Sequence, residues 1–183
     1  MRAFIAIDLD DSIKRKLAAL QQRLQQQTPD LRWVAPEKMH LTLKFLGDVS
    51  EQQVVPVSQA LDELRDQCRS FVISIEELGM FGAGKVVWAG IRDPDGQLAR
   101  CHGLCEQFLE SLGFSRENRL FQPHLTLARN RSPKNAAKIR QAIEQVSKFT
   151  AGTQHVSSLT FYQSTLTKRG PIYESMSKHR FPI

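Results

Sequence analysis

The sequence predicts an α+β fold in which two similar lobes are related by a pseudo-twofold axis. Three observations indicate this fold. Runs with strand periodicity alternate with runs of helical periodicity along the 183 residues. The tetrapeptide His-Leu-Thr-Leu occurs twice, beginning at His40 and at His124, 84 residues apart. The opening strands of the two halves have nearly the same offset, because Phe4 and Val86 lie 82 residues apart. Matching order at a nearly matching offset favours a duplication.

The first half is predicted to contain three strands and two helices. Residues 3–7 form a short apolar strand, and apolar side chains at helical spacing predict a helix over 11–27. Residues 40–46 alternate between apolar and polar side chains, which predicts a strand. A capping-box pattern then opens a helix over 51–69. Strict alternation over 71–78 predicts a strand with one face in water.

The second half repeats this order, and Ser132-Pro133 starts its last helix. The predicted elements are a strand at 85–91, a helix at about 96–112, a strand at 124–129, a helix at about 134–147, and closing strands near 156–166 and 172–179. No linker composition separates the halves. We therefore expect residues 1–183 to form one bilobal domain, with its repeated motifs at 40–43 and 124–127.

Length and composition bound the class of protein. A chain of 183 residues with 41% hydrophobic residues buries about 70% of its unfolded surface, so it needs no disulfide bonds or structural metal ions to fold. No apolar run approaches the roughly 20 residues that span a bilayer, and the N-terminal segment becomes acidic after about six residues, unlike a secretion signal. Three cysteines, Cys68, Cys101 and Cys105, lie in segments of helical pattern and predict free thiols in a reducing compartment. We expect a cytoplasmic monomer without membrane contact.

Positive charge is concentrated in the second half. Residues 1–92 contain 12 basic and 12 acidic side chains, whereas residues 93–183 contain 13 basic and 7 acidic ones, which supplies the whole net charge of +6. Such an excess favours an anionic partner, nucleic acid first, although a solvated basic surface is the alternative. The basic residues that flank the second motif are Arg116, Arg119, Arg129, Arg131, Lys134 and Lys138. They could follow an RNA backbone.

The two motifs supply a set of groups for phosphodiester chemistry. In a strand, residues i and i+2 face the same side, so His40 projects with Thr42, and His124 with Thr126. Two lobes that face each other would bring both pairs to one cleft. A neutral imidazole there accepts a proton from the attacking oxygen, and a protonated one donates to the leaving oxygen. The threonine hydroxyls donate to the phosphate oxygens. This chemistry requires no metal, and we predict no metal and no other cofactor.

A single His-x-Thr in a strand is usually structural. The same tetrapeptide in the same place of two similar halves favours a functional pair, because burying two imidazoles in a hydrophobic core would destabilise the fold. The two motifs are the signature of the 2H phosphoesterases, which the chain resembles from Phe4 to its final strands. The segments FIAIDL, MHLTLKFLGDV and FQPHLTLAR resemble the RNA 2′,3′-cyclic phosphodiesterases of bacteria and archaea, also called 2′–5′ RNA ligases.

This resemblance implies two antiparallel sheets flanked by helices, with the motifs facing each other across a central groove. It implies metal-independent opening of RNA 2′,3′-cyclic phosphates to 2′-phosphomonoesters and, in some members, the reverse 2′–5′ ligation. By the same resemblance His40 is the proton donor to the 3′-oxygen and His124 the proton acceptor that activates water. Thr42 and Thr126 match the phosphate-binding threonines. The residues alone leave the assignment of donor and acceptor open, because the two motifs are identical.

Two further basic residues follow the motifs. Arg129 matches a residue that family members place near the phosphate. Strict alternation points Arg129 away from His124, so it contributes only if the strand bends or ends there; otherwise it is a surface arginine. The same alternation places Lys44 on the face of His40, with a solvated lysine at the strand end as the alternative.

Aromatic residues are candidates for stacking on the bases of single-stranded RNA. Trp33, just before the first motif, is the best candidate among them. Core packing is the alternative for Trp33 and for Trp88, Phe45, Phe121 and Tyr162.

A metal site is not predicted elsewhere in the chain. Cys101, His102 and Cys105 resemble one superficially, but their spacing fits the buried stripe of a helix better than a zinc knuckle. His155 and His179 lack a threonine two residues further on, and we expect both at the surface.

The sequence therefore predicts a phosphodiesterase that acts on RNA ends carrying a 2′,3′-cyclic phosphate, with tRNA fragments among the candidate substrates. One alternative is an enzyme of the same fold that acts on a small nucleotide cyclic phosphate. Another is a non-catalytic RNA-binding module, against which the two intact motifs argue, since binding alone needs cations rather than titrating imidazoles.

Overall fold

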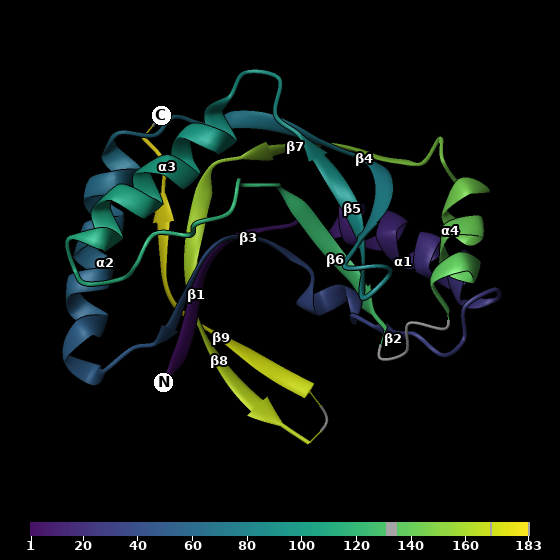
Figure 1. Cartoon of the computed structure of the whole chain (residues 1–183). Helices are drawn as coiled ribbons and strands as arrows, with labels where there is room; N and C mark the ends of the chain where they lie inside the picture. The colour runs from purple at the N-terminus through teal and green to yellow at the C-terminus, as the bar shows by residue number, and fades with distance from the viewer. Residues whose placement is uncertain (131–134, 169, 183) are drawn as a thin grey trace.

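The computed structural model of the chain describes residues 1–130, 135–168 and 170–182, which form two antiparallel sheets with helices outside them (Figure 1). The first sheet has the order β3 (His40–Asp48), β1 (Arg2–Asp8), β8 (Ser158–Thr167) and β9 (Gly170–Arg180). The second has the order β2 (Arg32–Trp33), β6 (His124–Arg129), β5 (Val86–Arg92), β4 (Phe71–Phe81) and β7 (Thr150–Val156). Each sheet contains one motif strand, which confirms the predicted α+β fold with two related lobes.

The helices lie outside the sheets in two groups (Figure 1). They are α1 (Asp11–Gln25), α2 (Glu51–Asp66), α3 (Gln97–Glu110) and α4 (Ala136–Glu144), and the short 3₁₀ helix η1 covers Pro36–Lys38. Helices α2 and α3 pack on each other beside the first sheet, whereas α1 contacts β7 and α4 contacts β4 of the second sheet. No helix in the described part of the chain is long and apolar enough to cross a membrane.

The two halves of the sequence are exchanged between the lobes. Strand β1 belongs to the first sheet, but α1 directly after it contacts β7 of the second. Strand β5 belongs to the second sheet, but α3 directly after it contacts β3 of the first. The order β3-β1-β8-β9 matches β6-β5-β4-β7 strand for strand, with β2 added at the edge. The first lobe therefore combines β3 and β1 from the first half of the sequence with β8 and β9 from the second half. The second lobe combines β6, β5 and β7 from the second half with β4 from the first half.

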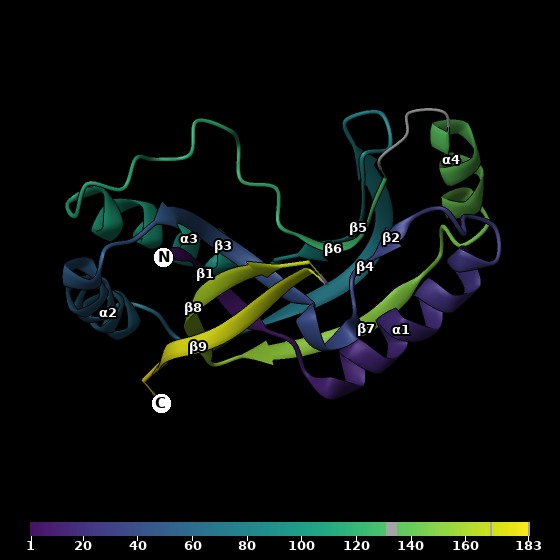
Figure 2. The ribbon, with the colours of Figure 1, turned by 90° about the horizontal axis from the view of Figure 1, so that it is seen from below.

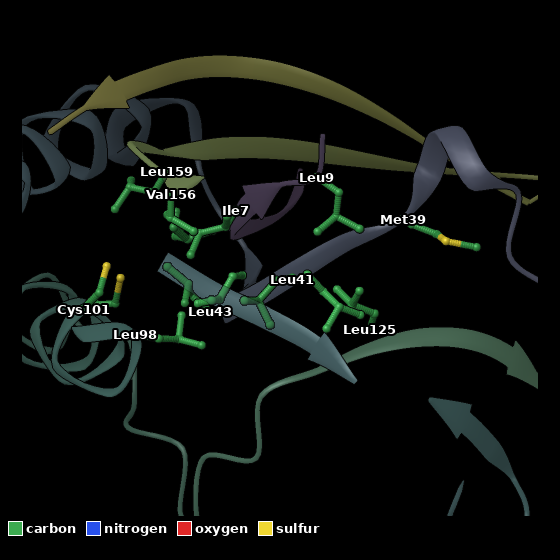
Figure 3. Close-up of a cluster of buried hydrophobic side chains, with 14 of the residues drawn as sticks. Ile7, Leu9, Met39, Leu41, Leu43, Leu98, Cys101, Leu125, Val156 and Leu159 are labelled. Atoms are coloured by element: carbon green, nitrogen blue, oxygen red, sulfur yellow. The ribbon is translucent and has the colours of Figure 1, made fainter. Parts of the chain in front are cut away.

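A continuous hydrophobic core joins the two lobes. The motif leucines Leu41, Leu43 and Leu125 are buried in one cluster with Ile7 and Leu159 (Figure 3). The leucines of each motif thus face inward, as the alternation of the motifs predicts. Burial of these side chains fixes which face of each motif strand is left for its histidine and threonine.

Most predicted elements are present, with three differences. Strands β2 and β7 were not predicted, and the helix predicted at 134–147 is observed as α4 from Ala136. Its predicted start at Ser132-Pro133 lies outside the described residues. Strand β3 continues two residues beyond the predicted strand at 40–46, to Asp48, and Gly47 there has a φ of +70°.

Candidate active site

The two motif histidines have the same environment at Nδ1. In His40 this atom lies 2.9 Å from the carbonyl oxygen of Lys38, and in His124 it lies 2.7 Å from that of Gln122. A carbonyl can only accept, so Nδ1 carries the proton in both rings. Each Nε2 is left without a protein partner among the described residues. Both rings can therefore act through Nε2, as a base when neutral and as an acid when protonated.

Both motif strands carry a β-bulge at the last leucine of the motif. In β3 the register skips Leu43, so that Thr42 opposes Ala6 and Lys44 opposes Ile5. In β6 it skips Leu127 in the same way. A bulge adds one residue to one strand and reverses the alternation beyond it. The residues that follow each motif therefore lie on the opposite face from the one that strict alternation predicts.

The bulge at Leu127 brings Arg129 to the face of the second motif. Arg129 opposes Val86, and Thr126 opposes Trp88, two residues further along β5. Directly opposed residues share a face, so Arg129 lies on the same side as Thr126 and His124. We call this side of the second sheet, and the side of the first sheet that carries His40 and Thr42, the motif faces.

The prediction that Lys44 shares the face of His40 is wrong, for the same reason. The bulge at Leu43 turns Lys44 inward, where its Nζ lies 2.8 Å from Glu106 Oε2 and 2.8 Å from the carbonyl oxygen of Ser115. Its side chain is only 3% exposed, so it is not a solvated lysine either. Glu106 Oε2 also accepts a hydrogen bond from the amide of Glu117. Through Ser115 and Glu117, the ion pair of Lys44 and Glu106 is hydrogen-bonded to the segment 111–123, which leads from α3 to the second motif (Figure 2).

His40 lies among aromatic rings. It stacks on Phe4 with ring centroids 4.7 Å apart, and Tyr173 approaches it edge-on at 5.1 Å. Burial lowers the pKa of His40, and the Lys38 carbonyl and the Asp8 carboxylate oppose that shift without cancelling it. This ring is therefore a stronger acid than an ordinary imidazole and is charged over a narrower range of pH.

Asp8 is the cross-strand neighbour of His40. Its carboxylate accepts hydrogen bonds from Thr160 at 2.9 Å, Tyr162 at 2.5 Å and Lys178 at 3.1 Å. Burial alone would raise the pKa of Asp8, but these three donors outweigh it and the pKa is lowered. A negative charge is thus fixed beside His40. The sequence interpretation missed Asp8, because it predicted no pairing between the strands at 3–7 and 40–46, and only that pairing places Asp8 opposite His40.

His124 has a different aromatic neighbour. Phe81 meets its ring edge-on, with centroids 5.0 Å apart, and Trp88 lies 5.2 Å from Phe81. The Trp88 indole lies flat on Gly79, where a Cβ would stand only 2.1 Å from the ring. Only glycine allows this approach, which holds the indole against the sheet beside the second motif.

The first sheet and the second sheet meet near the motifs. Strand β3 contacts β6, so the two motif strands are neighbours. Burial raises the pKa of Tyr173 on the first sheet, and the positive charge of Arg129 on the second lowers it in part. Tyr173, whose ring meets His40 edge-on, is therefore near enough to Arg129 to be affected by its charge.

Trp33 does not lie on a motif face. It opposes Ala128 in β6, and its side chain packs against the buried cluster of Leu31, Val87, Ala128 and Ile139. This geometry favours core packing over base stacking. Phe45, by contrast, is 70% exposed, and its register opposite Phe4 puts it on the face of His40.

The remaining candidates of the sequence have structural positions. Cys101 and Cys105 are fully buried, which confirms core packing, and His102 stacks on Phe121 at 3.9 Å. Among the described residues, no group of three or more side chains is arranged to hold a metal ion. His155 is exposed as expected.

The surface position expected for His179 is wrong. Its side chain is 3% exposed, and its ring nitrogens lie 2.8 Å from Asp62 and 2.8 Å from Ser177. The nearest charged partner belongs to α2, which no local sequence pattern relates to the last strand.

The predicted basic stretch is only partly described. Arg116 forms an ion pair with Glu110 at 2.8 Å, and both are exposed. Arg119 and Lys138 are exposed, the second on α4. Arg131 and Lys134 lie outside the described residues.

Comparisons with known proteins agree with this arrangement. The sequence profile of the LigT-like phosphoesterases matches residues 7–88 and 91–173. The chain is 32% identical over 183 residues to an RNA 2′,3′-cyclic phosphodiesterase of Methanothermobacter thermautotrophicus, covering 98% of each chain. It is 34% identical over 179 residues to one of Archaeoglobus fulgidus, covering 96% of this chain and 98% of the other.

Solved structures show the same fold. A protein of Thermus thermophilus matches with a TM-score of 0.84 and 23% identity, covering 99% of this chain and 98% of the other. LigT of Escherichia coli matches in its apo form with a TM-score of 0.80 and 26% identity, over 98% of this chain and 96% of the other. Its complex with 3′-AMP matches with a TM-score of 0.78 and 26% identity, over 98% and 97%. This chain therefore belongs to the LigT-like phosphoesterase family, a family of enzymes.

Proposed function

We propose that this enzyme hydrolyses RNA 2′,3′-cyclic phosphate ends to 2′-phosphomonoesters in the cytoplasm, by acid–base catalysis with its two motif histidines and without a metal. One observation carries the proposal. Both imidazoles bond through Nδ1 to a carbonyl and keep Nε2 unpartnered among the described residues. Because one chain supplies both groups, a monomer suffices. Relatives that carry the name RNA 2′,3′-cyclic phosphodiesterase align with 98% and 96% of the chain.

The proposed reaction needs one base and one acid at the same time. A water oxygen forms a bond to phosphorus while the bond from phosphorus to the 3′-oxygen breaks. His124 Nε2 takes the proton from water, and protonated His40 gives its Nε2 proton to the 3′-oxygen. The depressed pKa of His40 makes it a stronger acid than an ordinary imidazole, in keeping with the donor role. Proton exchange with solvent then restores both rings.

The phosphate is held by the groups beside the histidines. Thr42 and Thr126 are half-buried on the motif faces, where their hydroxyls can donate to the non-bridging oxygens. Arg129 adds a guanidinium on the same face, which suits the negative charge of the phosphoryl group. The same groups would serve the reverse ligation, in which an RNA 5′-hydroxyl takes the place of water.

The test uses a short RNA with a 2′,3′-cyclic phosphate end in the presence of EDTA. The wild type should yield the 2′-phosphate, and His40→Ala and His124→Ala should each lose about 10²–10⁴-fold in rate. His155→Ala is the matched control, because His155 is an exposed histidine without a partner threonine. A 3′-phosphate product, or full activity in either motif variant, would contradict the proposal. Inhibition by EDTA would contradict its metal independence.

A further inference from the structure

Two arginines stand side by side on the second motif face. Arg32 in β2 directly opposes Arg129 in β6, and the next pair, Trp33 with Ala128, packs into the core. Neighbouring residues of a strand face opposite sides, so Arg32 lies on the motif face with Arg129. Both side chains are exposed. Arg32 precedes the first motif by eight residues, and nothing in the sequence pattern relates it to the second.

This pairing is unfavourable without an anion. Like charges directly opposite each other destabilise a sheet. Within the described residues, neither Arg32 nor Arg129 has a carboxylate partner or a hydrogen bond. Bound phosphate groups would neutralise both guanidinium ions and turn the repulsion into attraction.

The hairpin of β8 and β9 lies next to the guanidinium of Arg32. Gly170 has a φ of +113°, and a Cβ built on it would stand 3.1 Å from Nη2 of Arg32. The start of β9 in the first sheet therefore touches the guanidinium of the second sheet. Lys168, in the turn just before it, is exposed and adds positive charge. Arg32 thus stands where the two sheets approach each other, with its guanidinium next to the hairpin of β8 and β9.

We propose that Arg32 binds a second phosphate, the phosphodiester on the 5′ side of the terminal nucleoside. The inference rests on the proposed function, in which Arg129 holds the terminal phosphate. A 2′,3′-cyclic phosphate is the 3′ end of its strand, so the next phosphate along the chain is the one on the 5′ side. Adjacent arginines on one strand pair match adjacent phosphates on one RNA strand. The ligand class is therefore an oligonucleotide of at least two nucleotides rather than a mononucleotide.

The experiment measures affinity for two ligands that carry the product end. Adenosine 2′-monophosphate has the terminal phosphate alone, and the dinucleotide ApA with a 2′-phosphate has the internal phosphate as well. The wild type should bind the dinucleotide about tenfold more tightly. Arg32→Ala should remove most of that advantage and leave the monophosphate affinity within about twofold. For the dinucleotide, the slope of log affinity against log salt should fall by about one.

The matched control is Arg140→Ala, since Arg140 is an exposed arginine on α4. It should leave both affinities unchanged. Equal losses for the two ligands in Arg32→Ala, or no loss for either, would overturn the role of Arg32. Because these affinities are measured with product ends, they do not depend on turnover. Failure of the wild type to open a cyclic phosphate would instead refute the proposed function.

Discussion

Arg129 and Lys44 show how one extra residue in a strand changes the site. Alternation along a strand predicts the faces of His40, Thr42, His124 and Thr126 from sequence alone. It fails just beyond each motif, because the bulges at the fourth motif residue reverse the alternation. A bulge depends on the partner strand, so no pattern within HLTLKF or HLTLAR reveals it. The family resemblance implies that Arg129 lies near the phosphate, and the bulge explains how Arg129 reaches the motif face.

Gln21 is predicted to maintain the bulge that aims Arg129. It is 4% exposed, and its Nε2 donates to the carbonyl oxygens of Val34 at 2.7 Å and of Leu127, the bulged residue, at 3.1 Å. Gln21→Met removes this donor and leaves two buried carbonyls one partner short. We expect kcat/KM on a cyclic-phosphate RNA to fall about tenfold, because a displaced Arg129 would lose about one charged hydrogen bond to the phosphate.

A double-mutant cycle separates positioning from general damage. In an Arg129→Ala background, Gln21→Met should have little further effect on kcat/KM, because the side chain that it positions is absent. Gln22→Met, at an exposed position of the same helix, is the control. The same fractional loss in both backgrounds would show that Gln21 acts through stability alone.

The Asp8→Asn variant is predicted to show whether His40 donates or accepts a proton in the reaction. The negative charge of Asp8 raises the pKa of His40, so its removal lowers that pKa further. If His40 is the acid, it is active below its pKa, and the high-pH limb of kcat/KM moves to lower pH. The profile of kcat/KM against pH for wild type and Asp8→Asn measures this shift, with the exposed Asp10→Asn as control. A shift of the low-pH limb instead would exchange the roles of the two histidines.

At the scale of elements, periodic segments were predictable and irregular ones were not. Helix α1 and strand β6 match their apolar patterns within about two residues. Strand β2 is only two residues long, and β7 contains Gly152 at a φ of +95°, so neither has a regular alternation of apolar and polar residues from which a strand could be predicted. Tertiary contacts alone bury His179 on α2 and Lys44 on α3. Such pairings join segments far apart in the chain, and local patterns carry no information on them.

The buried pair of Lys44 and Glu106 gives a stability prediction at this scale. Their side chains are 3% and 8% exposed, so removing one partner leaves a buried charge. Lys44→Met should lower the free energy of unfolding by about 3–5 kcal/mol, and Lys44→Met with Glu106→Leu should lose less than that. Urea denaturation of both proteins measures these changes. A double variant less stable than the single one would show that Glu106 stabilises the fold mainly through the Glu117 amide.

For the whole molecule, the pseudo-twofold relation is broken where it matters for substrate. Arg129 comes three residues after Thr126, and Phe45 comes three residues after Thr42, each beyond its bulge. One lobe therefore presents a cation and the other an exposed aromatic ring at equivalent positions. This asymmetry fits a ligand with a phosphate on one side and a base on the other.

Phe45→Ala is accordingly predicted to weaken the recognition of a base. Loss of one stacked base costs about 1–3 kcal/mol, so kcat/KM should fall roughly 5- to 150-fold on an RNA substrate. The fold should tolerate the change, since Phe45 is 70% exposed. Kinetics on a substrate that lacks the terminal base provide the control, because wild type and variant should then be equal. A persistent difference would show that Phe45 acts on something other than the base.

The exchange of strands between lobes has a consequence for how the protein is made. Strand β1 is flanked by β3, from early in the chain, and by β8, whose residues are synthesised after both motifs. A nascent chain that has emerged to residue 157 already contains both His-x-Thr motifs, but the first sheet still lacks β8 and β9. Until then one edge of β1 is open to pairing with other chains. The part of the site around His40 is therefore complete only after residues 158–180 have been synthesised.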